Sequence, residues 1–179
     1  FSCGQTLQWL RDRLGLFRSS AEIEPLAASV PDNGGVYLVP AFAGLCAPHW
    51  DREARASIVG LRLESGAAHL VRAGLEAMAY QTRDNVEALV AGGVPVPELR
   101  VDGGATANDL LCQFQADILG IPVLRPNELE RTALGVAYLA GAGVGRWQVP
   151  DDIERSWTVD RVFEPAMDET MRDALYGGW

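Results

Sequence analysis

The run Leu99-Arg-Val-Asp-Gly-Gly-Ala-Thr-Ala-Asn108 places the tightest constraint on how this chain can fold. A short apolar stretch, 99–102, ends in two consecutive glycines, and a helical pattern begins soon after them. Glycine has no side chain, so the backbone can turn sharply there and approach a ligand closely. The first N–H groups of the following helix would suit phosphate or another electron-rich group. The run therefore predicts a nucleotide-binding turn between a strand and a helix.

Apolar residues at helical or alternating spacing predict the other elements. Helices are expected over 3–14, 67–91, a segment from about Thr106 to Gly120, and 130–143. Short strands are expected over 36–39, 57–63, 99–102 and 121–124. Because strand, helix, strand and helix follow one another from 99 onward, we expect a parallel sheet with helical crossovers.

Three further expectations concern local structure. The segment 19–33 holds two prolines, several small residues and acids, and we expect a polar excursion there. Thr106 and Asp109 have the spacing of a capping box, which would start the second long helix at Thr106. The tail from 149 onward is acidic and shows no clear periodicity.

The composition excludes several kinds of chemistry, because all 15 basic residues are arginines. Without lysine there can be no Walker A loop and no Schiff-base catalyst, so a site for ATP would use backbone groups, amides and arginine. A length of 179 residues with 48% hydrophobic residues fits one domain with a real core. The net charge of −9, without a basic cluster, argues against nucleic acid or an anionic membrane as a partner.

The cysteine pattern indicates a reducing compartment. Cys3, Cys46 and Cys112 are widely spaced and do not form a metal-ligand pattern with one another or with either histidine. We therefore expect reduced thiols in a cytoplasmic protein. The longest apolar stretch, 133–145, is shorter than the roughly 20 residues that a membrane span needs, so no span is expected.

Both ends of the chain show patterns expected in the interior of a longer sequence. The chain begins without methionine, inside a helical pattern, and stops at Gly177-Gly178-Trp179 without a closing element. We expect it to be a fragment of a larger protein.

Six segments, in order along the chain, together span most of its length. They are Gln8–Asp12, Val36–Asp51, Ile58–Leu61 with His69–Glu76, Ala79–Asp84, Val101–Ala105 with Asn108, and Thr132–Gly141. In this order and at this spacing they resemble the C-terminal half of the FGGY family of carbohydrate kinases. Any one of them would be a weak signal, whereas six in order at the expected spacing are specific.

The resemblance implies an α/β fold of the ribonuclease H-like type found in actin and hexokinase. Residues 1–179 would form a single C-terminal, nucleotide-binding domain of a two-domain kinase, incomplete at its N-terminal edge. By position, Gly4 and Gln8 match nucleotide contacts on the first helix. Gly104 and Asn108 match contacts at the glycine turn, which Gly103 helps to form. The catalytic aspartate and the carboxylates that organise Mg²⁺ would belong to the absent N-terminal domain, so no catalytic residue is expected in this chain.

The implied reaction is phosphorylation of glycerol by ATP, which yields glycerol 3-phosphate and ADP. This part would bind ATP or ADP, and the fragment alone would be inactive. The segment 36–51 favours glycerol as the small-molecule substrate, while Cys46, His49, Arg52 and Ala56 depart from the pattern of the glycerol-phosphorylating members, and Gly74 from a family signature. A related sugar kinase acting on xylulose or gluconate is an alternative, and so is a non-catalytic actin-like nucleotide-binding module. A homo-oligomer is a further expectation from the family.

Each candidate residue also has a purely structural interpretation. The glycine pair suits a tight turn without a ligand, Asn108 suits the start of a helix, and Gln8 suits a solvated helix face. Asp102 and His49 are interpreted as structural residues. Cys46 and Cys112 are expected to be inert.

Overall fold

The computed structural model of the protein describes residues 3–148 and 150–179. Its helices, including two short 3-10 helices, η1 and η2, are α1 (Cys3–Asp12), η1 (Ser20–Glu22), α2 (Ile23–Ala28), α3 (Ala67–Ala91), η2 (Gly104–Ala107), α4 (Asp109–Leu119), α5 (Arg131–Gly143), α6 (Asp151–Ser156) and α7 (Glu169–Gly178). Its strands are β1 (Tyr37–Val39), β2 (Ser57–Val59), β3 (Leu99–Arg100), β4 (Val123–Pro126) and β5 (Val159–Phe163). The mixed α/β class expected from the sequence is confirmed.

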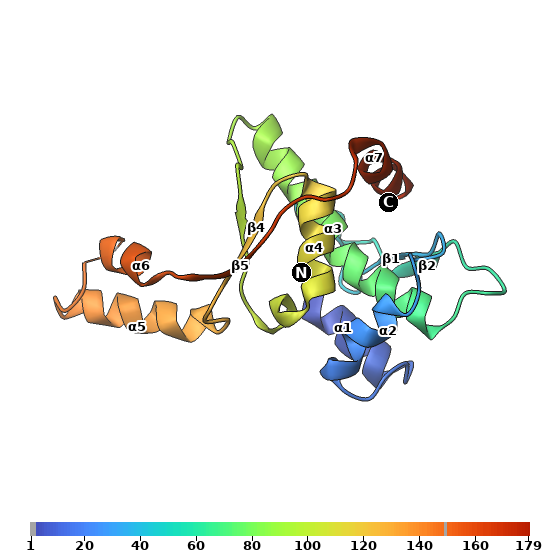
Figure 1. Ribbon diagram of the computed structural model, residues 1–179, viewed down its shortest axis with the longest axis horizontal. Helices are drawn as coiled ribbons and strands as arrows, with labels where there is room; N and C mark the ends of the chain where they lie inside the picture. Colours follow the sequence, from blue (N-terminus) through green and yellow to red (C-terminus); the bar gives the residue numbers. More distant parts are fainter. Residues whose placement is uncertain (1–2, 149) are drawn as a thin grey trace.

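The long helix α3 forms the centre of the molecule, and α1, α2 and α4 pack around it (Figure 1). Its apolar stripe includes Val71, Leu75 and Met78, which join one core cluster with Leu10 of α1 and Leu111 of α4. The bounds predicted for this helix, 67–91, are confirmed. A long amphipathic stripe that ends at two glycines is the kind of pattern that sequence reads well.

Gly74, which departs from the family signature, lies where α1 crosses α3. A Cβ placed on Gly74 would come within 2.9 Å of Cδ1 of Leu10, which is too close without a shift. Glycine at this position therefore permits the close approach of the two helices that carry the core.

The strands form two small sheets. In the first, β1 pairs antiparallel with β2, with Tyr37 opposite Val59. In the second, β3 pairs parallel with β4, with Leu99 opposite Val123, and this pair confirms the predicted parallel arrangement. Strand β5 then pairs antiparallel with β4, so the tail, which shows no pattern in the sequence, completes this sheet.

The polar excursion expected over 19–33 contains two short helices that the sequence does not predict, η1 and α2, over residues 20–28. Ile23 and Ala27, one helical turn apart, are both buried in the core. Pro25 lies in the first turn of α2, where its missing N–H has no intrahelical partner to lose. This six-residue helix is held by packing, which its composition does not indicate.

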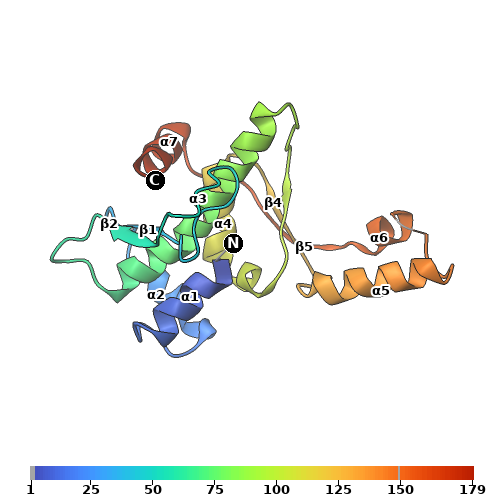
Figure 2. The ribbon, with the colours of Figure 1, turned by 180° about the vertical axis from the view of Figure 1, so that it is seen from behind.

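Helices α5 and α6 extend from one end of the molecule, away from α1 and α2, as Figures 1 and 2 show from opposite sides. Val136 and Leu139 of α5 are 65% and 67% exposed. Helix α7 packs on α3 and α4, where the Trp179 ring stacks on that of Tyr80 with centroids 5.2 Å apart. Within the described part of the chain, no helix combines the length and apolar character that a membrane crossing requires.

Candidate functional site

In the glycine turn after β3, the first glycine, Gly103, has an unusual backbone conformation. Gly103 has φ of 88° and ψ of 164°, a region that residues with a side chain rarely enter. Its N–H donates to the carbonyl of Leu129, and its own carbonyl accepts from the Thr106 hydroxyl at 2.7 Å. The turn is therefore fixed from both sides, and the chain passes directly into η2.

Asn108, not Thr106, caps the helix that follows. Its side-chain Oδ1 accepts a hydrogen bond from the N–H of Leu111 at 2.8 Å, and its backbone is extended as an N-cap requires. The Thr106 hydroxyl bonds back to Gly103, so the predicted capping box of Thr106 and Asp109 is wrong. This hydrogen bond supports the structural interpretation of Asn108 as a helix cap. A contact between its side chain and a ligand would be a second role.

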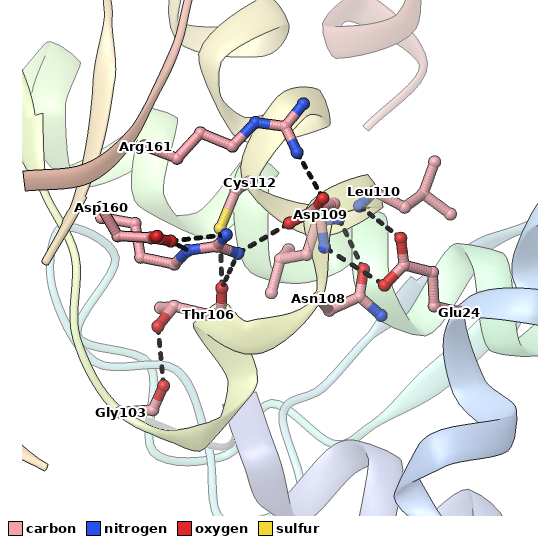
Figure 3. A network of polar contacts seen from close by, with 11 residues as sticks. Glu24, Gly103, Thr106, Asn108, Asp109, Leu110, Cys112, Asp160 and Arg161 are labelled. Atoms are coloured by element: carbon pink, nitrogen blue, oxygen red, sulfur yellow. Dashed lines mark hydrogen bonds and ion pairs between the residues drawn. The ribbon is translucent and has the colours of Figure 1, made fainter. Parts of the chain in front are cut away.

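The start of α4 does not offer free N–H groups, which corrects the expectation that a phosphate would bind there. The carboxylate of Glu24 accepts hydrogen bonds from the N–H groups of Asp109 and Leu110, at 3.2 and 3.3 Å. The N–H of Leu111 bonds to the side chain of Asn108, and that of Asn108 itself to the carbonyl of Ala105. Figure 3 shows the contacts of Glu24 and of the Asn108 side chain at the start of the helix. All four N–H groups that a helix start leaves open are occupied.

The backbone donors that stay available belong to η2. Among the residues that the structure describes, the N–H groups of Gly104 and Ala105 have no hydrogen-bond partner. A Cβ on Gly104 would meet no atom within 4 Å, so open space lies beside it. A ligand can therefore approach this part of the backbone closely.

Arg125, whose side chain is largely buried, contacts both η2 and the start of α4. The Arg125 guanidinium donates to the Thr106 carbonyl at 3.0 Å and to Asp109 at 2.7 Å, and it also pairs with Asp160 at 2.8 Å. Its side chain is 12% exposed, whereas Arg161, which also pairs with Asp109, is 52% exposed. No local sequence pattern indicates this network, because its members come from separate elements, β4, α4 and β5.

Cys112 lies within the same cluster and is chemically quiet. Its thiol donates to the Thr106 carbonyl at 3.3 Å, and burial raises the pKa of the thiol to about 11. The thiol is therefore protonated at neutral pH, which agrees with the expectation that it is inert. Cys46 and Cys112 are both free thiols.

A cavity of about 660 Å³ lies between α1, η1, α2 and the glycine turn. It brings together four of the five predicted site residues, which are Gly4, Gln8, Gly104 and Asn108. Gly103 lies outside its lining and shapes the turn instead. The cavity thus joins two segments that are about 100 positions apart in the sequence.

The cavity has mostly apolar walls with a few polar groups. Leu7, Phe17, Ile23 and Leu75 supply side-chain carbon, and the polar groups include those of Gln8, Arg11, Ser20, Glu24 and Asn108. This combination, and a volume of several hundred Å³, suits a flat ring with polar edges. Ser20 and Glu24 were missed from the sequence, since they lie in the segment expected to be a polar excursion, and Phe17 lies just before it.

The other polar candidates lie elsewhere. Asp102 lines a separate hollow of about 340 Å³ beside Tyr138 and Trp157. Asp84 accepts hydrogen bonds from the Tyr176 hydroxyl at 2.6 Å and from the Trp179 indole at 3.2 Å, so it anchors α7. His49 is half-exposed and lies 3.5 Å from the same carboxylate. The structural interpretation of His49 is supported by this contact.

Comparison with known proteins gives a consistent assignment over nearly the whole chain. Residues 1–144 match the model of the C-terminal domain of the FGGY family of carbohydrate kinases. Over 180 aligned residues, which cover 100% of this chain, it is 55% identical to a glycerol kinase of Trichlorobacter lovleyi and 56% identical to one of Carboxydothermus hydrogenoformans. The chain spans 36% of the length of these relatives.

Solved structures give the same result at the level of the fold. The chain is similar to a glycerol kinase of Plasmodium falciparum solved with ADP, with a TM-score of 0.85 and 34% identity over 99% of this chain and 35% of that one. It is also similar to a xylulose kinase of Rhodospirillum rubrum, with a TM-score of 0.78 and 30% identity over 97% of this chain and 36% of that one. The predicted resemblance and fold class are confirmed.

Proposed function

Because the chain belongs to the FGGY family of carbohydrate kinases, we propose that it forms the nucleotide-binding part of a kinase that phosphorylates glycerol. The parent protein would transfer the terminal phosphoryl group of ATP to a primary hydroxyl of glycerol, which gives glycerol 3-phosphate and ADP. Residues 1–179 would form its C-terminal domain, and the N-terminal domain would bind the alcohol and remove its proton. The high identity to proteins named glycerol kinase favours glycerol over xylulose or gluconate.

The observation that carries this proposal is the cavity that joins Gly4 and Gln8 of α1 to Gly104 and Asn108. In the proposal its apolar walls contact the adenine ring, and the amides of Gln8 and Asn108 meet polar edges of the nucleotide. The free N–H groups of Gly104 and Ala105 would lie near the phosphates. The chain therefore contributes the position of the nucleotide, which is a large part of catalysis in phosphoryl transfer.

Mg²⁺, oligomeric state and location complete the proposal. Among the described residues, no group of three or more His, Cys, Asp or Glu could hold a metal ion, so Mg²⁺ would be bound by residues outside this chain. The free thiols of Cys46 and Cys112 and the use of ATP fit a cytoplasmic location. The resemblance to the family also implies that the parent protein assembles as a homo-oligomer. The net charge of −9 argues against nucleic acid as a partner.

The substitution Gly104→Ala tests the site directly. The added methyl group meets no atom within 4 Å and the backbone φ is not left-handed, so the protein itself should accept it without strain. The methyl would occupy space that the nucleotide needs, and we expect the Kd for ADP in the parent protein to rise by about tenfold or more. Gly177→Ala in α7, where the added methyl also meets nothing within 4 Å, is the matched control and should leave the Kd unchanged.

Two results would contradict the proposal. If Gly104→Ala binds ADP as tightly as the unchanged parent protein, the nucleotide does not bind at this turn. If the parent protein binds ADP but transfers no phosphoryl group to glycerol, xylulose or gluconate, the non-catalytic actin-like module becomes the better interpretation. Turnover with xylulose or gluconate and not with glycerol would favour the related sugar kinase.

A further inference from the structure

Glu24 connects α2 to the start of α4 through hydrogen bonds to backbone N–H groups, which no sequence motif indicates. Its two carboxylate oxygens accept hydrogen bonds from Asp109 and Leu110, which lie 85 and 86 positions further along the chain. The side chain also lines the cavity that holds the predicted nucleotide residues. Figure 3 shows the carboxylate facing the first turn of α4, next to Asn108.

The carboxylate occupies the place that an anionic ligand would otherwise take. The N–H groups at a helix start and the positive end of the helix dipole attract anions such as phosphate. Here a side chain of the protein already uses two of those donors and supplies a negative charge beside them. A phosphate group at the same position would lose these hydrogen bonds and meet like-charge repulsion.

The same contacts fix the backbone on which Asn108 is carried. Asn108 directly precedes the two amides that Glu24 holds, and its Oδ1 is bonded to the next amide, that of Leu111. From the opposite side, Arg125 holds Asp109 and the Thr106 carbonyl. The segment from η2 into α4 is thus clamped by one acid from α2 and one arginine from β4.

We propose that Glu24 is a positioning residue of the nucleotide site, an inference that rests on the proposed function. It holds the start of α4 so that Asn108 faces the cavity, and it keeps the phosphate groups of the nucleotide away from that helix end. The cavity wall beside Glu24 then accepts the uncharged part of the nucleotide, which is the base with its sugar.

The experiment compares the parent protein with its Glu24→Ala and Glu24→Gln variants. In Glu24→Ala the amides of Asp109 and Leu110 lose their acceptor. We expect the KM for ATP to rise about tenfold, because the loss of these two charge-assisted hydrogen bonds frees the backbone that carries Asn108, while kcat and the KM for glycerol stay within about twofold. Because the helix start is now open, inorganic sulfate should compete with ATP at a concentration about threefold lower than in the unchanged protein. Glu24→Gln retains one acceptor oxygen and should give smaller changes of the same kind.

Glu22→Gln is the matched control. Glu22 lies two residues earlier, and its carboxylate bonds to the N–H groups of Arg18 and Ser19 and not to α4. This variant loses one negative charge in the same segment and should leave the KM for ATP and the sulfate competition unchanged.

The outcomes separate the inference from the proposed function. If the unchanged parent shows no ATP-dependent turnover, the proposed function is wrong. If it turns over and Glu24→Ala leaves both the KM for ATP and the sulfate competition unchanged, Glu24 does not position the nucleotide. Equal increases in the KM values for ATP and glycerol, with a lowered melting temperature, would show a purely structural role and would also overturn the inference. If Glu24→Ala does not fold, the same comparison with Glu24→Gln decides.

Discussion

Gly103 and Gly104 are neighbours in the sequence, but the structure uses them differently. Gly103 has a left-handed φ of 88° and makes the turn, whereas Gly104 has an ordinary backbone and open space beside it. Glycine is therefore favoured at position 103 by the backbone conformation. At position 104 the proposed site favours glycine, because a side chain would fill the space beside the backbone. The sequence alone shows the pair and does not separate these two requirements.

Asn108 combines a structural contact with a proposed ligand contact, and Asn108→Asp separates them. Aspartate keeps the acceptor that caps the N–H of Leu111, so the melting temperature should change little. It removes the amide NH₂ and adds a negative charge, so we expect the affinity of the parent protein for ADP to fall by about tenfold. Asn108→Ala should lose both, with about 1 kcal/mol of stability lost as the cap is removed.

Calorimetry with ADP and thermal unfolding of the two variants provide the measurement. If Asn108→Asp binds ADP as well as the unchanged parent protein, the side chain serves only as a cap.

Cys112 should react with alkylating agents only at high pH or after unfolding. Burial raises the pKa of its thiol to about 11, so at pH 8 the thiolate makes up about a thousandth of the population. Below pH 11, each increase of one pH unit should raise the rate of reaction with iodoacetamide about tenfold. Mass spectrometry of the peptide that contains Cys112, with and without urea, measures this rate. Equal rates in the folded and the unfolded chain at pH 8 would contradict the assigned pKa shift.

At the scale of elements, the predictable parts of the fold are those that carry their own signal. Helix α3 has the predicted bounds, because its apolar stripe is long and two glycines end it. Helix α2 was missed, since six residues that include a proline and one acid show no periodicity, and the helix is held by burial of Ile23 and Ala27. Strand β5 was missed because four of its five residues are exposed, which removes the alternation that identifies a strand.

The candidate site follows the same rule. Gly4, Gln8, Gly104 and Asn108 were predicted from the resemblance to the family, and the structure places all four on one cavity, while their contact with a nucleotide stays a prediction. Glu24 was not predicted, because its hydrogen bonds form only when α2 packs beside the start of α4. Long-range pairings of single polar residues leave no pattern in one sequence.

The two arginines that contact Asp109 give a matched pair for testing the network between elements. Arg125 is largely buried and joins η2, α4 and β5, so Arg125→Met should lower the free energy of unfolding by about 1–3 kcal/mol, because the Thr106 carbonyl and Asp109 lose a charged partner. Arg161 is half-exposed, and Arg161→Met should cost less than about 1 kcal/mol.

Urea unfolding of both variants of the chain gives the comparison. Similar losses for the two substitutions would show that the buried network does not hold the turn.

At the scale of the whole molecule, the two ends of the fold differ in how much they are packed. The α1–α4 end contains the main core and the candidate cavity. Helix α5 at the other end exposes Val136 and Leu139 by about two thirds of their surface, and among its described residues only Gly141 is buried. The cavity therefore lies in the well-packed part of the chain, which suits the positioning of a ligand.

The 179-residue chain, taken by itself, should transfer no phosphoryl group to glycerol. Of the described residues that line the cavity, Glu24 alone carries a carboxylate, and its oxygens are bonded to the amides of Asp109 and Leu110. No free base is therefore placed to take a proton from an alcohol, a step that kinases assign to a carboxylate. We expect the purified chain, incubated with ATP, Mg²⁺ and glycerol, to form no more glycerol 3-phosphate than its Gly104→Ala variant. Formation of product that Gly104→Ala abolishes would contradict this prediction and would place the catalytic group within these residues.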